Sequence, residues 1–246
     1  MSGGVGPLNL RQAVEDLFEH RPVLIGLDFD GTLAPLVEHP SLATPDHSAI
    51  EILGRLATRP GISVAVISGR AMADLSEHVG ELPGVILIGE HGNDVGVPVA
   101  PSPLLEEAKQ LVGALVAATA GSVSEVKPRS VTFHYRNVEP GGEAHALTLL
   151  RSWAAQRPQV SVLEGKEVIE LSVASRNKGD AITDLAGEEA RILYIGDDTT
   201  DETVFAVLGP DDVGIKVGPG ETSAAHRVDD VAGVVEVLEV IDLIST

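Results

Sequence analysis

Several short runs in this sequence are almost entirely apolar, and three of them stop at polar, glycine-containing turns. A run without a polar side is typical of a strand in a parallel sheet that is buried on both faces. The predicted strands are Val23–Asp28, Ile62–Ile67, Val85–Ile88, Ile192–Ile195 and Val213–Val217. Helical periodicity precedes or separates them at Asn9–His20, Pro45–Thr58 and Met72–Val79. This alternation predicts an α/β fold with a parallel sheet.

The pattern changes near Pro98. After a longer helix at Leu104–Ala120, the segment Ser130–Arg136 alternates between apolar and polar residues, which predicts a half-exposed antiparallel strand. Val160–Leu163 and Val168–Val173 flank a predicted hairpin turn. The earlier pattern returns from Asn177. We therefore expect residues 1–97 and 173–246 to form one catalytic core and residues 98–172 an inserted α+β cap domain.

Composition limits the classes of function. The 246 residues carry a formal net charge of −20, with no cysteine. Disulfide scaffolds, cysteine-based zinc sites and thiolate catalysis are therefore excluded. The acidic balance argues against nucleic acid or an anionic membrane as the main partner. The sequence does not specify an oligomeric state, and a monomer is compatible with it.

Nothing in the sequence predicts a membrane span or export. The longest apolar stretch, Leu111–Ala120, is about half of the ~20 residues that a bilayer requires. The first residues, MSGGVGPLNL, lack the basic start and apolar centre of a signal peptide. We therefore expect a cytoplasmic protein.

The polar turns bring carboxyl groups together. Ligands of an open parallel sheet bind outside the carboxyl ends of its strands, where the sequence places Asp28, Asp30, Asp197, Asp198 and Asp201. A lone aspartate after a strand is typical of a helix cap or a turn. Five in one crevice differ, because two carboxylates ~4 Å apart repel by about 4 kcal/mol at an effective dielectric constant near 20. A divalent cation with oxygen ligands would neutralise them. Because this cluster contains neither His nor Cys, Mg²⁺ is favoured over zinc.

The segment LDFDGTL at 27–33, the turn Ser68-Gly69-Arg70, the later Lys178 and GDDTTDE at 196–202 resemble the haloacid dehalogenase-like (HAD) phosphohydrolase superfamily. The resemblance implies a HAD-like Rossmannoid core with a parallel sheet and an inserted α+β cap. It implies that Asp28 is the nucleophile of an aspartyl-phosphate and that Asp30 is the general acid and base. Ser68 would hold the phosphoryl oxygens, and Lys178 would offset their charge.

The same resemblance implies the metal ligands. Asp28, Asp197 and the main-chain carbonyl of Asp30 would hold Mg²⁺, while Asp198 and Asp201 would act behind them or through water. Gly69 and Arg70 would lie at the phosphate. Taken alone, Lys178 also fits a solvated residue at a helix start, and Arg70 a solvated helix end.

The inserted segment carries a second resemblance. Lys127, Arg129, His134 and Arg136 lie close together, as a substrate-facing group or as a basic patch on a solvated face. The pattern Glu125-x-Lys127-x-x-Ser130 before His134-Tyr135-Arg136, the turn Gly89–Gly92, and Gly165–Glu170 resemble trehalose-6-phosphate phosphatases. The resemblance implies that the sugar or the cap contacts come from His91, Glu125, Lys127, Arg129, Ser130, His134, Lys166 and Glu170. The family usually has Arg-Pro where Ser172-Val173 stands.

The two resemblances together imply an enzyme, a Mg²⁺-dependent phosphoric monoester hydrolase that converts trehalose 6-phosphate to trehalose and phosphate in trehalose biosynthesis. A phosphatase for another sugar phosphate, such as sucrose, glucosylglycerol or mannosylglycerate phosphate, is the nearest alternative. A catalytically silent sugar-phosphate sensor is a further one, because a fold does not establish activity.

Overall fold

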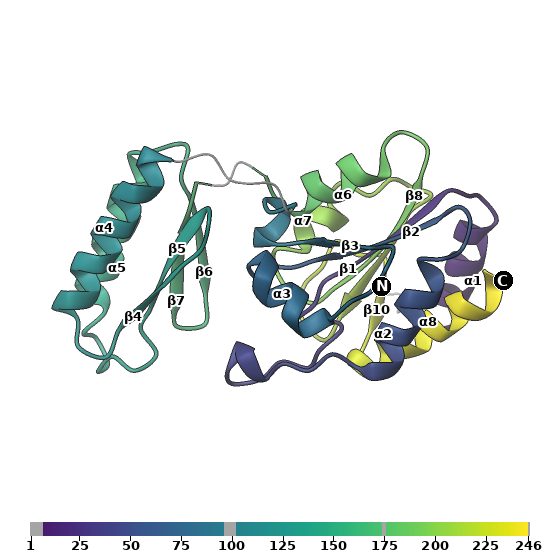
Figure 1. Cartoon of the computed structure of the whole chain (residues 1–246), viewed down its shortest axis with the longest axis horizontal. Helices are drawn as coiled ribbons and strands as arrows, with labels where there is room; N and C mark the ends of the chain where they lie inside the picture. The colour runs from purple at the N-terminus through teal and green to yellow at the C-terminus, as the bar shows by residue number, and fades with distance from the viewer. Residues whose placement is uncertain (1–6, 96–101, 174–175, 246) are drawn as a thin grey trace, which may run out of the picture. The chain divides into compact units, whose positions relative to one another are not determined.

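The structure is a computed structural model that describes residues 7–95, 102–173 and 176–245. The chain divides into two compact units. One comprises Met1–Gly96 and Arg176–Thr246, and the other comprises Val97–Ser175. Figure 1 shows both units with their helices and strands labelled.

The larger unit is built on a six-stranded sheet in the order β10-β9-β8-β1-β2-β3, with every neighbouring pair parallel. Its strands are β1 (Val23–Leu27), β2 (Ile62–Ile67), β3 (Val85–Ile88), β8 (Arg191–Gly196), β9 (Val213–Val217) and β10 (His226–Val228). β8, β1 and β2 lie side by side at its centre. The residues that follow these three strands therefore emerge at one edge.

Helices cover both faces of this sheet, which explains its apolar strands. They are α1 (Pro7–Phe18), α2 (His47–Leu56), α3 (Met72–Val79), α6 (Lys178–Ala186), α7 (Glu202–Phe205) and α8 (Val231–Ile244), with short 3-10 helices η1 (Pro40–Leu42) and η2 (Glu90–Gly92). Helices α1, α2 and α8 cover one face of the sheet, and α6 and α7 cover the other (Figure 1). Val23 and Ile25 pack with the first group of helices, and Leu24 packs with the second.

The smaller unit has a four-stranded antiparallel sheet in the order β4-β5-β7-β6. Its elements are α4 (Pro103–Ala118), β4 (Val123–Val126), β5 (Ser130–His134), α5 (Ala144–Ala155), β6 (Ser161–Gly165) and β7 (Val168–Ser172). Val131, Phe133, Ile169 and Leu171 point to the face that α4 and α5 cover. The alternate residues, such as Thr132 and Glu170, therefore make up the other, polar face.

The α/β class, the parallel sheet and the antiparallel insertion are confirmed. β5 differs from the prediction, because Ser130–Phe133 are buried on both faces rather than half-exposed. Thr132 explains part of this, since its hydroxyl bonds to the Glu170 carboxylate across the strands and is shielded there. Strands β4 and β10 and helix α8 were not predicted.

Gly26 of β1 permits a close approach, and its substitution should destabilise the larger unit. Gly26 lies opposite Tyr194 of β8, and an added Cβ would lie 2.6 Å from Ile182 Cδ1 and 2.7 Å from Tyr194 Cδ2. Gly26→Ala should lower the free energy of unfolding by about 1–3 kcal/mol, the usual cost of overpacking, as measured by urea denaturation. Gly54→Ala is the matched control, because a Cβ there meets only Leu82 Cδ2, at 3.5 Å. It should be neutral or stabilise helix α2 by about 0.5–1 kcal/mol. Equal losses in both variants would contradict the steric argument.

Candidate active site

The functional side chains gather at the carboxyl ends of the central strands. Asp28 directly follows β1, Ser68 follows β2, and Asp197 follows β8. Asp28 and Ser68 are 4% and 1% exposed. Carboxylate oxygens of Asp28, Asp197 and Asp201 all lie within 4.8 Å of one another. The carboxylate cluster, as we call these three residues, lies at the predicted strand ends. It contains three of the five expected carboxyl groups, because Asp30 is bound to Arg70 and Asp198 is exposed.

Lys178 joins the carboxylate cluster from the first residue of α6. Its Nζ donates to Asp28 Oδ1 at 2.7 Å and to Asp201 Oδ1 at 2.8 Å, and its side chain is 2% exposed. A capping box between Asn177 and Asp180 fixes the start of this helix. The alternative that Lys178 is a solvated residue at a helix start is wrong.

The charges of the cluster are only partly balanced. Burial raises the pKa of Asp28 well above its ordinary value, against the opposing effect of Lys178. Burial and the neighbouring Asp201 raise the pKa of Asp197 from 3.8 to about 6. Burial alone would lower the pKa of Lys178, but Asp28 and Asp201 outweigh it and raise the pKa. One ammonium group thus bonds to two of the three carboxyl groups, Asp28 and Asp201, which leaves negative charge to be neutralised.

Asp201 is the most completely bonded member of the cluster. It is 0% exposed. Its Oδ1 accepts hydrogen bonds from Lys178 and from the Tyr194 hydroxyl, and its Oδ2 accepts one from the Asp198 amide. Asp198 itself is exposed and bonds to Thr199. Asp201 therefore holds the surrounding groups in place.

Asp197, unlike Asp201, has an oxygen that accepts no hydrogen bond from the described residues, which suits a metal ligand. This oxygen, Oδ1, is buried. Gly31 allows this placement, because its φ of +83° disfavours a side chain and an added Cβ would lie 2.1 Å from Asp197 Oδ2. A buried carboxylate oxygen without a donor, beside a second underbalanced carboxylate, suits a divalent cation with oxygen ligands. The cluster can therefore bind such a metal.

Arg70 makes contacts that the sequence did not reveal. Its Nε and Nη2 donate to the two oxygens of Asp30, each at 2.7 Å, and its side chain is 5% exposed. Nη2 also donates to Pro40 O, and Nη1 bonds to Asp74 at 2.7 Å and to His78 at 3.4 Å. These contacts use all five N–H groups of the guanidinium. In this conformation Arg70 orients Asp30, and the solvated helix end is wrong for it.

The turn at Gly69 packs tightly against the loop that carries His91. His91 N donates to Ser68 O, and Glu90 N donates to Arg70 O. A Cβ on Gly69 would lie 2.3 Å from the His91 ring. Glu90 and His91 have positive φ values of 49° and 55°, a conformation that is rare without glycine and is held here by these contacts. The structure thus brings His91 beside the predicted phosphate-binding turn.

In the smaller unit, several predicted sugar contacts lie on the polar face of its sheet. Lys127 Nζ donates to Glu170 Oε2 at 3.1 Å, and Thr132 donates to the same oxygen at 3.0 Å. His134 and Glu125 are paired at 3.1 Å.

The remaining predicted residues of this unit, Ser130, Lys166 and Arg129, take no part in these two pairs. Ser130 lies opposite Ser172, with its hydroxyl buried and without a partner among the described residues. Lys166 is exposed in the turn between β6 and β7, and Arg129 precedes β5.

Sequence reasoning missed four polar residues near these groups. Thr132 and His78 bond to Glu170 and Arg70, and the Tyr194 hydroxyl bonds to Asp201. Lys216 is 5% exposed and donates to the main-chain oxygens of Asp197 and Val217. A lysine inside the apolar run 213–217 was the one available signal, because burying an ammonium group requires acceptors.

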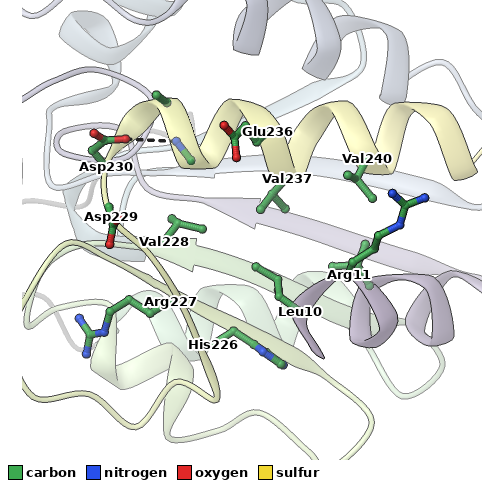
Figure 2. A pocket seen from close by; sticks show the side chains of 13 residues that line it. Leu10, Arg11, His226, Arg227, Val228, Asp229, Asp230, Glu236, Val237 and Val240 are labelled. Carbon is green, nitrogen blue, oxygen red and sulfur yellow. Dashed lines mark hydrogen bonds between the residues drawn. The ribbon is translucent and has the colours of Figure 1, made fainter. Parts of the chain in front are cut away.

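A separate hollow of about 620 Å³ lies between α1, β10 and α8 of the larger unit (Figure 2). Leu10, Val14, Val228 and Val237 are among its lining residues, and Arg11 and Glu236 also lie along it. No residue of the carboxylate cluster lines it. The carboxylate cluster therefore lies elsewhere in this unit.

The profile of the trehalose-phosphatase family matches residues 26–232. The chain belongs to this family. Its fold is the HAD-like core with a cap that the sequence predicted. None of the helices in residues 7–95, 102–173 and 176–245 has the length and apolar character that a membrane span needs.

Individual relatives agree with this assignment. The chain is 35% identical to a bifunctional trehalose-6-phosphate synthase/phosphatase of Thermoproteus tenax, over 94% of this chain and 33% of the relative. It is 34% identical to a trehalose-phosphate phosphatase of Mycobacterium ulcerans, over 88% of this chain and 60% of the relative. The chain thus spans a third of the length of the first relative and three fifths of the length of the second. The solved C-terminal domain of a C. albicans trehalose-6-phosphate phosphatase superposes with a TM-score of 0.76 at 25% identity, over 94% of this chain and 96% of that one.

The raised pKa of Asp197 predicts that the metal-free protein loses stability as pH rises from about 4 to about 6. Over this interval the folded state keeps a proton on Asp197, whose pKa is about 6, whereas the unfolded chain has released it, so each rise in pH favours unfolding. Urea denaturation in chelator at about pH 4 and about pH 6.5 measures the slope. Asp197→Asn should reduce it, and a divalent metal should restore stability at the higher pH. An unchanged slope in the variant would contradict the assignment to Asp197.

Proposed function

We propose that this chain hydrolyses trehalose 6-phosphate to trehalose and phosphate, with Mg²⁺, through an aspartyl-phosphate at Asp28. One observation carries the proposal. The buried Asp28 carboxylate lies at the carboxyl end of a strand of the parallel sheet. It bonds to the ammonium group of Lys178 and lies near Asp197, whose Oδ1 has no hydrogen-bond partner among the described residues. This arrangement supplies a nucleophile and groups that offset the charge of a phosphoryl group.

In the first step, an oxygen of Asp28 forms a bond to phosphorus while the bond from phosphorus to the sugar oxygen breaks. Asp30 gives a proton to the departing sugar oxygen, which leaves as a hydroxyl group. Arg70 orients Asp30 for this transfer. Each Asp30 oxygen accepts one N–H of Arg70 and keeps a second lone pair.

In the second step, water attacks the phosphorus and the bond between phosphorus and the Asp28 oxygen breaks. Asp30, now without its proton, accepts one from the water, so that phosphate leaves and both carboxyl groups return to their starting states. Lys178 donates two of its three N–H groups to Asp28 and Asp201. The third is available to a phosphoryl oxygen during both steps.

The phosphate would bind at the Ser68-Gly69-Arg70 turn in this proposal, without the Arg70 guanidinium, whose N–H groups are bonded to other parts of the protein in this conformation. Ser68 Oγ accepts a hydrogen bond from the Arg70 amide, so its O–H remains a donor for a phosphoryl oxygen. Asp28 and Asp197, with the main-chain carbonyl of Asp30, would hold Mg²⁺, which supplies charge neutralisation at the phosphoryl oxygens when bound. Asp198 and Asp201 would orient these ligands.

The polar face of the smaller unit would recognise the sugar. Glu125, Lys127 and Glu170 offer charged donors and acceptors on one sheet face, and His134 adds a ring nitrogen, which suits the hydroxyl groups of a sugar. Arg129, Ser130, Lys166 and His91 would add contacts, or help to close the cap.

A second candidate is a phosphatase for another sugar phosphate. Ser172 favours it, because this small side chain lies in register between Ser130 of β5 and Ser161 of β6. The family usually has arginine at the position of Ser172. A row of three serines would therefore offer a sugar different contacts beside Glu170.

Phosphate release from a panel of sugar phosphates tests both candidates. Trehalose 6-phosphate should give the highest kcat/KM, with activity lost in EDTA and regained with Mg²⁺. A preference for sucrose, glucosylglycerol or mannosylglycerate phosphate would support the second candidate. Binding without turnover would identify a silent sensor and reject both.

Asp28→Asn should lower kcat for phosphate release by roughly 10³-fold or more, because the amide oxygen is a poor nucleophile. Asp211→Asn is the control, since that side chain is 72% exposed and should change little. Phosphate release by both variants, with circular dichroism to confirm folding, is the measurement. Retained turnover in folded Asp28→Asn would remove Asp28 from the mechanism.

Glu170→Gln should lower kcat/KM for trehalose 6-phosphate by about 10- to 100-fold, the effect of losing one or two hydrogen bonds to a charged group. The value for p-nitrophenyl phosphate, which has no sugar, should stay within about threefold. Glu164→Gln is the matched control, because Glu164 lies on the same hairpin as Glu170 and its ion pair with Arg151 of α5 is exposed. Equal losses on both substrates in Glu170→Gln would reject a role in reading the sugar.

A further inference from the structure

The Tyr194 hydroxyl is a buried polar group that the proposed mechanism does not use. Tyr194 lies in β8, is 0% exposed, and donates to Asp201 Oδ1 at 2.7 Å. The same oxygen accepts a hydrogen bond from Lys178 at 2.8 Å. Tyr194 and Lys178 therefore share one acceptor.

The surrounding structure fixes the position of this hydroxyl. The Tyr194 ring lies against Gly26, where an added Cβ would be 2.7 Å from its Cδ2. On the same side of the sheet, Phe205 packs edge-on to the ring at 5.8 Å between centroids. A buried ring that is packed in this way holds its O–H in one place.

Two carboxylates compete for the single ammonium group of Lys178. Asp28 and Asp201 both accept from Nζ, at 2.7 and 2.8 Å, and both are buried. A buried carboxylate oxygen needs donors, and each donor it gains reduces its demand for another. The Tyr194 hydroxyl supplies Asp201 with a neutral donor, so that Lys178 need not serve Asp201 alone.

We propose that Tyr194 is a positioning residue that sets how Lys178 is shared between Asp28 and Asp201. With the hydroxyl present, Lys178 stays close to Asp28 and to the phosphoryl group. Without it, Lys178 moves toward Asp201 and away from Asp28. The inference rests on the proposed function in that Asp28 and Lys178 are taken to act on the phosphoryl group.

Tyr194→Phe tests this, because it removes one oxygen atom and keeps the ring. We expect kcat to fall by about 5- to 20-fold, by the same factor for trehalose 6-phosphate and p-nitrophenyl phosphate, with KM changed less than twofold. The loss should be common to both because Lys178 acts on the phosphoryl group, which the two substrates share. Tyr135→Phe is the matched control and should keep wild-type kinetics.

A metal titration gives a readout that does not depend on turnover. In Tyr194→Phe, Asp28 loses part of its ammonium partner, so a cation should bind there with less competition. The Mg²⁺ concentration for the half-maximal rise in Tm should fall at least about threefold relative to wild type and to Tyr135→Phe. A Tyr194 that only packs would lower Tm and leave this concentration unchanged.

The outcomes separate this inference from the proposed function. An unchanged kcat, a loss confined to the sugar phosphate, or an unchanged half-maximal Mg²⁺ concentration would each overturn the role of Tyr194. If wild type hydrolyses p-nitrophenyl phosphate and not trehalose 6-phosphate, the proposed substrate fails and Tyr194 is judged on the aryl phosphate. If wild type hydrolyses neither, the proposed function fails and the metal titration alone decides how Tyr194 affects Lys178.

Discussion

The buried ammonium group of Lys178 holds the functional centre of this protein together. It joins Asp28, after β1, to Asp201, after β8, with bonds of 2.7 and 2.8 Å. Breaking such a buried pair by removing one partner leaves an uncompensated charge, which is strongly destabilising. Burial and the neighbouring carboxyl groups raise the pKa values of Asp28 and Asp197, and the one ammonium group of Lys178 does not offset this. The same imbalance is the reason that the cluster could hold a divalent cation.

The fold places this centre at the ends of adjacent strands, and glycine residues leave the space that its side chains need. β8, β1 and β2 are adjacent and parallel, so their carboxyl ends deliver Asp197, Asp28 and Ser68 to one edge. Room for the large groups behind them comes from missing side chains, at Gly26 beside Tyr194 and at Gly31 beside Asp197. The positions of the site residues in this unit therefore depend on how tightly the core packs behind them.

Some of the site could be predicted because the chemistry follows local rules. An acid directly after a buried strand emerges at the ligand edge of a parallel sheet, which located Asp28 and Asp197 from the sequence. The partners of Arg70 could not be predicted in this way. Its contact with Asp30 joins residues 40 positions apart, and only the path of the chain between them decides whether a guanidinium meets a carboxylate or solvent. Tyr194 was missed because one aromatic residue in an apolar strand is typical of a hydrophobic core.

By itself, the sequence determined the α/β class, the parallel sheet, the antiparallel insertion and the acidic edge, because hydrophobic periodicity and polar strand ends are local properties. Only the tertiary structure decided which charges are paired. It showed that Lys178 bridges Asp28 and Asp201 and that Arg70 binds Asp30. It also showed that one oxygen of Asp197 has no donor within the described part of the chain. The physical reason is that pairing requires a separation of about 3 Å. Distances on that scale between remote residues are set by the packing of whole strands and helices.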